Sequence, residues 1–280
     1  VSVLRNQGGG TFADRIDYAV GINPYSVTTA DADGDGHVDL VAANYGSDTI
    51  SVLQNLGDGT LAARVDYAVG SRPQSVTAAD LDGDGHVELI VANSKSNSVS
   101  MLRNQGDGTF AARVDYAVGL SPYSVTAADM DGDGHVDLVA ANYLSDTVSV
   151  LRNLGDGTFA ARVDYAVGGY SRYPSSVTTA DVDGDGHVDL IAASFEVPGA
   201  VSVLRNLGDG TFATRVLYEG GTDASSVTAA DVDGDGHVDL IVAKSTSSGT
   251  VSVLRNLGDG TFAARVDYVA GKYPRRVTAA

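Results

Sequence analysis

The chain repeats itself with a period of about fifty residues. An acidic stretch that reads DADGDGHVDL at residues 31–40 returns with small changes, and its first aspartate stands at positions 31, 80, 129, 181 and 231. Variants of VSVLRN and of GDGTF repeat in step with this stretch. A repeat of this length predicts an array of similar structural units and not one irregular fold.

Each repeat contains four short segments with the character of β-strands. In the third repeat they read SVTAAD, HVDLVAAN, VSVLRN and FAARVDYAVG, and turns rich in Gly, Asp, Asn and Ser separate them. No stretch of the sequence has helical periodicity of useful length. Four strands in about 40 to 50 residues are typical of a β-propeller blade, whereas solenoid repeats are usually shorter and have fewer strands. The sequence therefore predicts an all-β propeller of four-stranded blades.

The strand count predicts five complete blades and part of a sixth within one domain, residues 1–280. The complete blades are expected at about residues 26–70, 75–119, 124–168, 176–220 and 226–271. Residues 1–21 supply a third and a fourth strand and residues 276–280 a first strand, so we expect six blade positions, the last built from both ends of the chain. Five or seven blades, or a piece of a longer array, are the alternatives.

Each acidic loop has the residue types and the spacing of a calcium site. Carboxylates stand at its positions 1, 3, 5 and 9, and glycines at positions 4 and 6. Alternate residues of a tight loop can direct their oxygens at one hard cation, and glycine permits the sharp turn. Position 7 is always His, which would act through its backbone carbonyl. The predicted ligands are Asp31, Asp33, Asp35, His37 and Asp39; Asp80, Asp82, Asp84, His86 and Glu88; Asp129, Asp131, Asp133, His135 and Asp137; Asp181, Asp183, Asp185, His187 and Asp189; and Asp231, Asp233, Asp235, His237 and Asp239.

A magnesium site, an EF-hand or a solvated turn fits the acidic loops less well than a calcium site between strands. Magnesium demands strict octahedral geometry, and an EF-hand needs flanking helices and a glutamate at position 12, where the first loop has Ala42. A solvated acidic turn would not repeat one spacing five times. Five divalent cations would add ten positive charges and reduce the formal net charge from −18 to −8.

The chain resembles the FG-GAP and VCBS repeat family, whose calcium-loop repeats also build the head domains of integrin α-subunits. The resemblance is carried by SPYSVTAADMDGDGHVDLVAANYLSDTVSVLRNLGDGTF at residues 121–159 and by its counterparts along the chain. It implies a propeller with about five bound Ca²⁺ ions on the loop residues named above. It also implies extracellular adhesion, carbohydrate or protein binding, or an accessory role on a secreted enzyme. The literal Gly-Ala-Pro is replaced by phrases such as GLSPYS, and a sixth acidic loop is absent.

The loops that differ between repeats are predicted to share the face opposite the acidic loops. They connect the second strand to the third and each blade to the next, and loops on a rigid scaffold often carry recognition. Tyrosines concentrate in them, where they either bind a ligand or pack between neighbouring loops. These candidates are Tyr25, Tyr45, Tyr123, Tyr143, Tyr170, Tyr173 and Tyr273. The remaining tyrosines recur in the fourth strand, where we expect them to pack between blades.

Composition and motifs narrow the function further. The net charge of −18 argues against nucleic acid as a partner, and no apolar run is long enough for membrane insertion. The first residues lack the features of a signal peptide, so an exported form would have lost its leader. No unrepeated catalytic set interrupts the repeats, so we expect a non-enzymatic, extracellular binding or adhesion module. A module that assembles chains through terminal strands is the alternative, and a polysaccharide lyase or its accessory domain is the least favoured.

Overall fold

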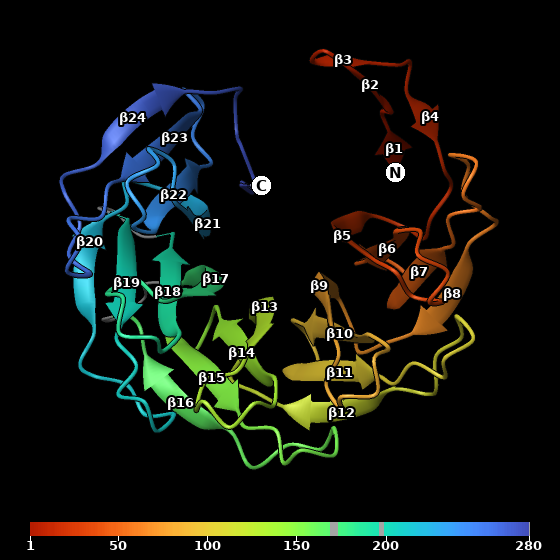
Figure 1. Ribbon diagram of the computed structural model, residues 1–280, viewed down its shortest axis with the longest axis horizontal. Helices are drawn as coiled ribbons and strands as arrows, with labels where there is room; N and C mark the ends of the chain where they lie inside the picture. The colour runs from red at the N-terminus through yellow and green to blue at the C-terminus, as the bar shows by residue number, and fades with distance from the viewer. Residues whose placement is uncertain (169–172, 196–198, 280) are drawn as a thin grey trace. The chain divides into compact units, whose positions relative to one another are not determined.

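The computed structural model describes residues 1–168, 173–195 and 199–279, and this part of the chain contains strands and turns without a helix. Five antiparallel sheets of four strands follow one another, and the strands of each sheet lie side by side in chain order (Figure 1). The blades are β5 (Pro24–Ala30), β6 (Asp39–Asn44), β7 (Thr49–Leu53) and β8 (Val65–Ala68); β9 (Pro73–Ala79), β10 (Glu88–Asn93), β11 (Ser98–Leu102) and β12 (Val114–Ala117); β13 (Pro122–Ala128), β14 (Asp137–Asn142), β15 (Thr147–Leu151) and β16 (Val163–Ala166); β17 (Pro174–Ala180), β18 (Asp189–Ser194), β19 (Ala200–Leu204) and β20 (Val216–Glu219); and β21 (Ala224–Ala230), β22 (Asp239–Lys244), β23 (Thr250–Leu254) and β24 (Val266–Val269). These sheets confirm the predicted fold class.

Residues 1–17 form part of a further blade. β1 (Ser2–Val3) pairs with β4 (Ile16–Asp17), and β2 (Asn6–Gly8) pairs with β3 (Thr11–Phe12). The Ser2–Asp17 pairing repeats the Ser51–Asp66 pairing between β7 and β8, so β1 and β4 correspond to a third and a fourth strand. The assignment of residues 1–21 to a partial blade remains a prediction.

The predicted first strand at 276–280 is not formed over residues 276–279. The chain nevertheless follows β21 as a first strand would. Ser225 Oγ donates to the Pro274 carbonyl at 2.9 Å, and the Val277 amide donates to Ser226 Oγ at 3.3 Å. The same two contacts join β17 to β21, through Ser175 and Ser176. The composite last blade and the single-domain assignment remain predictions.

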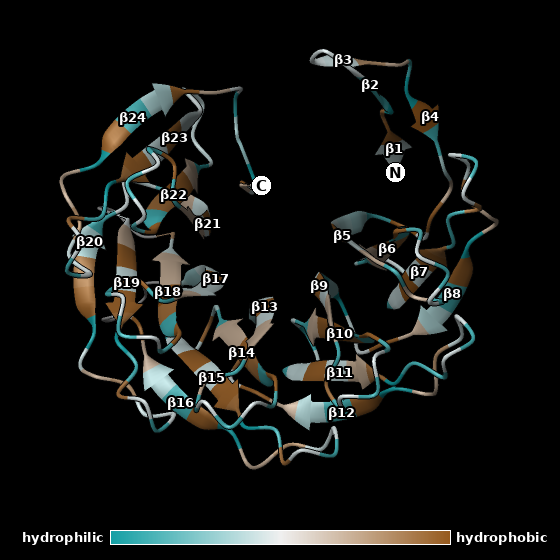
Figure 2. Cartoon of the chain, in the orientation of Figure 1, coloured by the Kyte–Doolittle hydropathy of each residue, from teal (hydrophilic) through white to brown (hydrophobic). Residues whose placement is uncertain are grey.

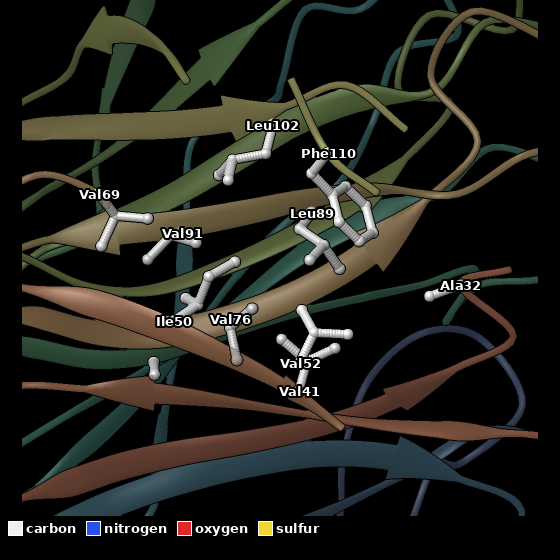
Figure 3. Close-up of a cluster of buried hydrophobic side chains, with 11 residues drawn as sticks. Ala32, Val41, Ile50, Val52, Val69, Val76, Leu89, Val91, Leu102 and Phe110 are labelled. Atoms are coloured by element: carbon white, nitrogen blue, oxygen red, sulfur yellow. The ribbon is translucent and has the colours of Figure 1, made fainter. Parts of the chain in front are cut away.

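The chain divides into two compact units, residues 1–117 and 118–280, and in each of them the apolar core lies between neighbouring blades. The second strand of each complete blade is buried along its whole length, which explains its run of Leu, Val, Ile and Ala. In the first unit, Val41 and Ile50 pack with Val76 and Leu89 of the next blade (Figure 3). Figure 2 colours the chain by hydropathy and shows apolar residues on the strands and polar residues in most connections.

The packing of three fourth-strand tyrosines, Tyr67, Tyr165 and Tyr218, confirms their predicted position between blades, whereas Tyr268 on β24 is 56% exposed. Tyr67 meets Phe110 of the following blade edge to face, with 5.5 Å between ring centroids. The Tyr165–Phe212 and Tyr218–Phe262 pairs repeat this contact in the second unit. The fourth strands themselves are shorter than predicted, because only four residues of each pair with the third strand.

A buried polar chain crosses the strands of three blades. In the first blade Asn44 Nδ2 donates to Ser51 Oγ at 2.9 Å, and Ser51 Oγ donates to Asp66 Oδ1 at 2.6 Å. The same contacts recur between the corresponding Asn, Ser and Asp of the second and third blades. In the fifth blade Lys244 replaces the asparagine, and its Nζ lies 2.7 Å from Asp267 Oδ2. These bonds satisfy the amide nitrogens, hydroxyls and carboxylates of this polar chain, whereas Asn44 Oδ1, Asn93 Oδ1 and Asn142 Oδ1 are buried without a hydrogen-bond partner.

The core predicts that alanine substitutions at two leucines of the third blade have very different effects on the free energy of unfolding. Leu138 is 0% exposed on β14, whereas Leu154 is 63% exposed in a turn. Leu138→Ala should lower the free energy of unfolding by about 2 to 5 kcal/mol, because it removes buried atoms and leaves a cavity. Leu154→Ala should change it by less than about 0.5 kcal/mol. Denaturant unfolding of both variants checks this expectation, and equal effects would contradict the assigned core.

Candidate metal centres

Each acidic loop is held in a tight turn by its own carboxylates. In the 31–39 loop, Asp31 Oδ1 accepts a hydrogen bond from the Gly34 amide at 2.8 Å, and Asp31 Oδ2 accepts one from the Gly36 amide at 2.9 Å. Both glycines have positive φ, 75° and 86°, a conformation that costs glycine little. The same two bonds from the first aspartate recur in the 80–88, 129–137, 181–189 and 231–239 loops.

The carboxylate at position 9 joins its loop to the end of the third strand. Asp39 is 0% exposed, and its Oδ2 accepts a hydrogen bond from the Ala32 amide at 2.8 Å. Its Oδ1 accepts one from the amide of Asn55, just beyond β7, at 2.7 Å. Glu88 makes the equivalent pair of bonds with its longer side chain. Position 9 therefore fixes the loop against the sheet whether the residue is Asp or Glu.

Burial makes the ionised form of these position 9 carboxylates costly. Desolvation raises the pKa of Asp39 and of Glu88, and raises the pKa values of Asp137 and Asp189 to about 6. The backbone hydrogen bonds oppose this rise, and the neighbouring loop carboxylates add to it. A bound cation would favour the ionised form of all of them.

Five groups of three carboxylates have ligand atoms within 4.8 Å of one another. Four groups combine positions 1, 3 and 9, and the 181–189 loop instead combines positions 1, 3 and 5. The groups are Asp31, Asp33 and Asp39; Asp80, Asp82 and Glu88; Asp129, Asp131 and Asp137; Asp181, Asp183 and Asp185; and Asp231, Asp233 and Asp239. The remaining predicted carboxylates, Asp35, Asp84, Asp133, Asp189 and Asp235, stand outside these groups. One acidic cluster in each complete repeat can thus hold a metal ion.

Two buried oxygens test whether these residues fit a cation. Asp82 Oδ1 and Asp183 Oδ1, both from position 3, are buried and have no hydrogen-bond partner. A buried carboxylate oxygen without a partner is unfavourable. A hard cation at the centre of the group would satisfy both oxygens, so the donor set fits an oxygen-seeking divalent ion.

The histidines at position 7 have a packing role that agrees with their strict repetition. A Cβ built on Gly57 would lie 2.5 Å from His37 Nε2, so the imidazole ring lies directly over this turn. The rings of His86, His135, His187 and His237 cover the matching glycines of their own blades. The proposed carbonyl ligand at this position remains a prediction.

The sequence patterns did not identify an asparagine that links an acidic loop to the next blade in three places, two of them in the second unit. Asn104 Nδ2, in the second blade, donates to the carbonyl of Ala32 in the 31–39 loop at 2.9 Å and to Val87 of its own blade at 3.1 Å. Asn206 and Asn256 bridge to Met130 and Val182 in the same way, each at 2.7 Å. The repeated LRN phrase, which contains this asparagine, was the sequence feature that could have indicated its role.

Glycine in the GDGTF turn allows this close approach. A Cβ on Gly210 would lie 2.7 Å from Asp131 Cβ of the preceding blade, and one on Gly260 would lie 2.6 Å from Asp183 Cβ. Any larger residue would push the turn away from the position 3 aspartate. The acidic loops are therefore packed between two blades.

The tyrosines of the variable loops lie at the other end of the strands. Ala30 pairs with Asp39 next to the acidic loop, whereas Pro24 pairs with Asn44 at the far end, beside Tyr25 and Tyr45. This end of a seven-residue strand is about 20 Å from the acidic end. The predicted separation of the two loop sets is therefore present within the blade.

The tyrosines form two groups, a stacked group in the second unit and a tilted pair in the first. In the second unit the rings of Tyr123 and Tyr143 are 4.3 Å apart, Tyr143 and Tyr173 are 4.8 Å apart, and Phe195 meets Tyr143 edge to face. In the first unit Tyr25 and Tyr45 are 5.1 Å apart, and the Arg72 guanidinium lies 5.5 Å from the Tyr45 ring centroid. Tyr273 is 57% exposed, and Tyr170 lies outside the described residues.

Comparison with known protein families identifies the family to which the chain belongs. The FG-GAP-like repeat matches residues 1–42, 31–91, 80–140, 129–192, 181–242 and 231–280, which together span the whole chain. The chain therefore belongs to the FG-GAP-like repeat family, and six matched repeats are consistent with six blade positions. No curated protein matches it in sequence.

Solved structures share the fold at low sequence identity. A Bacteroides fragilis NCTC 9343 protein with the provisional name 6-phosphogluconolactonase has a TM-score of 0.72 at 16% identity, over 98% of this chain and 78% of that chain. The V. cholerae biofilm matrix protein has a TM-score of 0.51 at 21% identity, over 88% of this chain and 39% of that one. The Photorhabdus luminescens Tc holotoxin pore has a TM-score of 0.51 at 22% identity, and the chain spans 94% of its own length but 13% of the toxin chain. These similarities show the fold alone.

The described residues include no helix with the length and apolar character needed to cross a membrane.

The acidic clusters predict a strong dependence of stability on divalent cations. Calcium should raise the thermal unfolding midpoint, and excess EGTA should reverse the rise, because an ion that binds only the folded chain stabilises it by mass action. A site at a hundredfold excess of ion over its dissociation constant contributes about 2.7 kcal/mol. Differential scanning calorimetry measures the shift, and magnesium at equal concentration should give a smaller one. Identical midpoints with calcium and EGTA would contradict a metal role for the loops.

Proposed function

We propose that the chain is a non-enzymatic, calcium-stabilised propeller domain that acts outside the cell and binds carbohydrate through its tyrosine-bearing loops. Ca²⁺ is the ion that the oxygen-only donor sets favour, and millimolar extracellular calcium suits sites of modest affinity. The acidic loops serve the scaffold in this proposal, since they repeat almost unchanged in every complete blade. Recognition is assigned to the loops that differ.

The observation that carries the binding proposal is the Tyr123–Tyr143–Tyr173 stack. Each tyrosine comes from a different variable segment: Tyr123 from β13, Tyr143 from the turn after β14, and Tyr173 from the entry to β17. Their stacking answers the question of whether such residues contact a ligand or each other. They contact each other, and this forms one aromatic group in which the Tyr143 ring lies against those of Tyr123 and Tyr173.

The backbone at Tyr173 has a conformation that all the repeats share. Tyr173 has φ of 47°, and the equivalent residues Asn23, Arg72, Ser121, Asp223 and Tyr273 have φ of 50° to 58°. The Asp146 carboxylate accepts a hydrogen bond from the Tyr173 amide at 3.1 Å, as the Asp48 carboxylate does from the Arg72 amide at 2.8 Å. This repeated backbone feature holds the Tyr173 ring against Tyr143.

Carbohydrate is the partner that this group fits best. Sugars combine apolar ring faces with many hydroxyls, and rigid tyrosines beside carboxylates offer contacts for both at a low cost in conformational entropy. Asp146 in the second unit and Asp48 in the first lie beside the tyrosine groups. Each carboxylate accepts a hydrogen bond from a backbone amide of the next blade. A protein partner is the other outcome that the experiment below separates.

The tyrosine stack predicts which variant loses binding. The calcium-loaded chain should bind a subset of glycans on an array, and Tyr143→Ala should reduce that binding about twofold to tenfold, because aromatic contacts are worth about 0.5 to 1.5 kcal/mol. Tyr268→Ala is the matched control, since Tyr268 is 56% exposed on β24 and belongs to neither tyrosine group.

Two results would contradict the carbohydrate assignment. Absence of glycan binding by the folded, calcium-loaded chain would leave a protein partner for these loops. Glycan binding that Tyr143→Ala leaves intact would place the site elsewhere on the chain.

A further inference from the structure

Four of the five acidic loops carry an arginine against their position 3 aspartate. Arg103 Nη2 lies 3.3 Å from Asp82 Oδ2, Arg152 Nε lies 2.7 Å from Asp131 Oδ2, and Arg205 Nη1 lies 3.3 Å from Asp183 Oδ2. Arg255 pairs with Asp233 in the same way. Each arginine directly follows the third strand of the same blade, in the LRN phrase.

The 31–39 loop differs because the residue after β7 is Gln54. Asp33 forms no ion pair with any residue that the structure describes, and a Cβ built on Gly108 would meet both Asp33 Cβ and Gln54 Nε2. Gln54 therefore occupies the place of the arginine without its charge. The carboxylates of this loop are otherwise the same as those of the 129–137, 181–189 and 231–239 loops.

A guanidinium beside the third aspartate opposes cation binding in either of two ways. If it stays in place, it repels the incoming divalent ion over a few ångström, and if it moves away, its ion pair with the carboxylate is lost. The half-exposed position of these arginines screens both effects. We expect a difference in affinity of about threefold to tenfold per site.

We propose that Gln54 makes the 31–39 loop the high-affinity calcium site of the chain, which fills before the four loops that carry an arginine. The inference rests on the proposed calcium-binding function and adds an order to the occupation of its sites. At limiting calcium the first complete blade is loaded while the other four are not. The arginine at the end of the third strand is the residue that sets affinity.

Isothermal titration of the calcium-free whole chain with CaCl₂ tests the order of filling. The expected isotherm has one tight site and a weaker class of four. Gln54→Arg should remove the tight site, and Arg152→Gln should create a second one with about threefold to tenfold higher affinity than its class. Arg64→Gln is the control, because Arg64 pairs with Asp66 on the fourth strand and donates to the Val20 carbonyl, and neither residue belongs to an acidic loop.

The outcomes separate this inference from the proposed function. Five equal sites, or a tight site that survives Gln54→Arg, would overturn the inference and leave calcium binding intact. No calcium binding by the wild-type chain would overturn the calcium proposal itself. Circular dichroism of each variant shows whether it is folded, and Arg152→Gln keeps the test decisive if Gln54→Arg fails to fold.

Discussion

The buried carboxylate at position 9 of each acidic loop is the constraint on which the rest of the structure depends. It accepts one hydrogen bond from its own loop and another from the end of the third strand, as Asp39 does with Ala32 and Asn55. A buried negative charge is costly unless its surroundings compensate it. Two amides supply part of this compensation, and a cation shared with positions 1 and 3 would supply the rest.

The same loops connect neighbouring blades within each unit. An asparagine from the following blade holds the loop carbonyl at position 2, and a glycine in the following turn allows the position 3 aspartate to approach. A cation bound in these loops would thus be coupled to the packing of one blade on the next. This coupling explains why the acidic loop, the asparagine and the GDGTF turn repeat together, while the loops at the other end of the strands are free to differ.

The period and the strand patterns predicted the fold and the acidic loops well, because each repeat carries the same local signals. The sequence did not reveal which repeated polar residues bridge between blades. Asn104 and Arg103 read as ordinary residues at the end of a strand, and their roles depend on contacts with residues about seventy and twenty positions away. The variable tyrosines were found from their uneven distribution, but their stacking required the structure.

Hydrogen exchange with and without calcium tests the central claim, that the acidic loops are cation sites which hold neighbouring blades of the same unit together. Calcium should slow amide exchange in the 31–39 loop and also in the segment around Asn104, which lies in the following blade. The 129–137 loop with Asn206, and the 181–189 loop with Asn256, should respond in the same paired manner. Unchanged exchange in both members of each pair would contradict cation binding by the loops. Slowing confined to the loops would contradict the coupling between neighbouring blades.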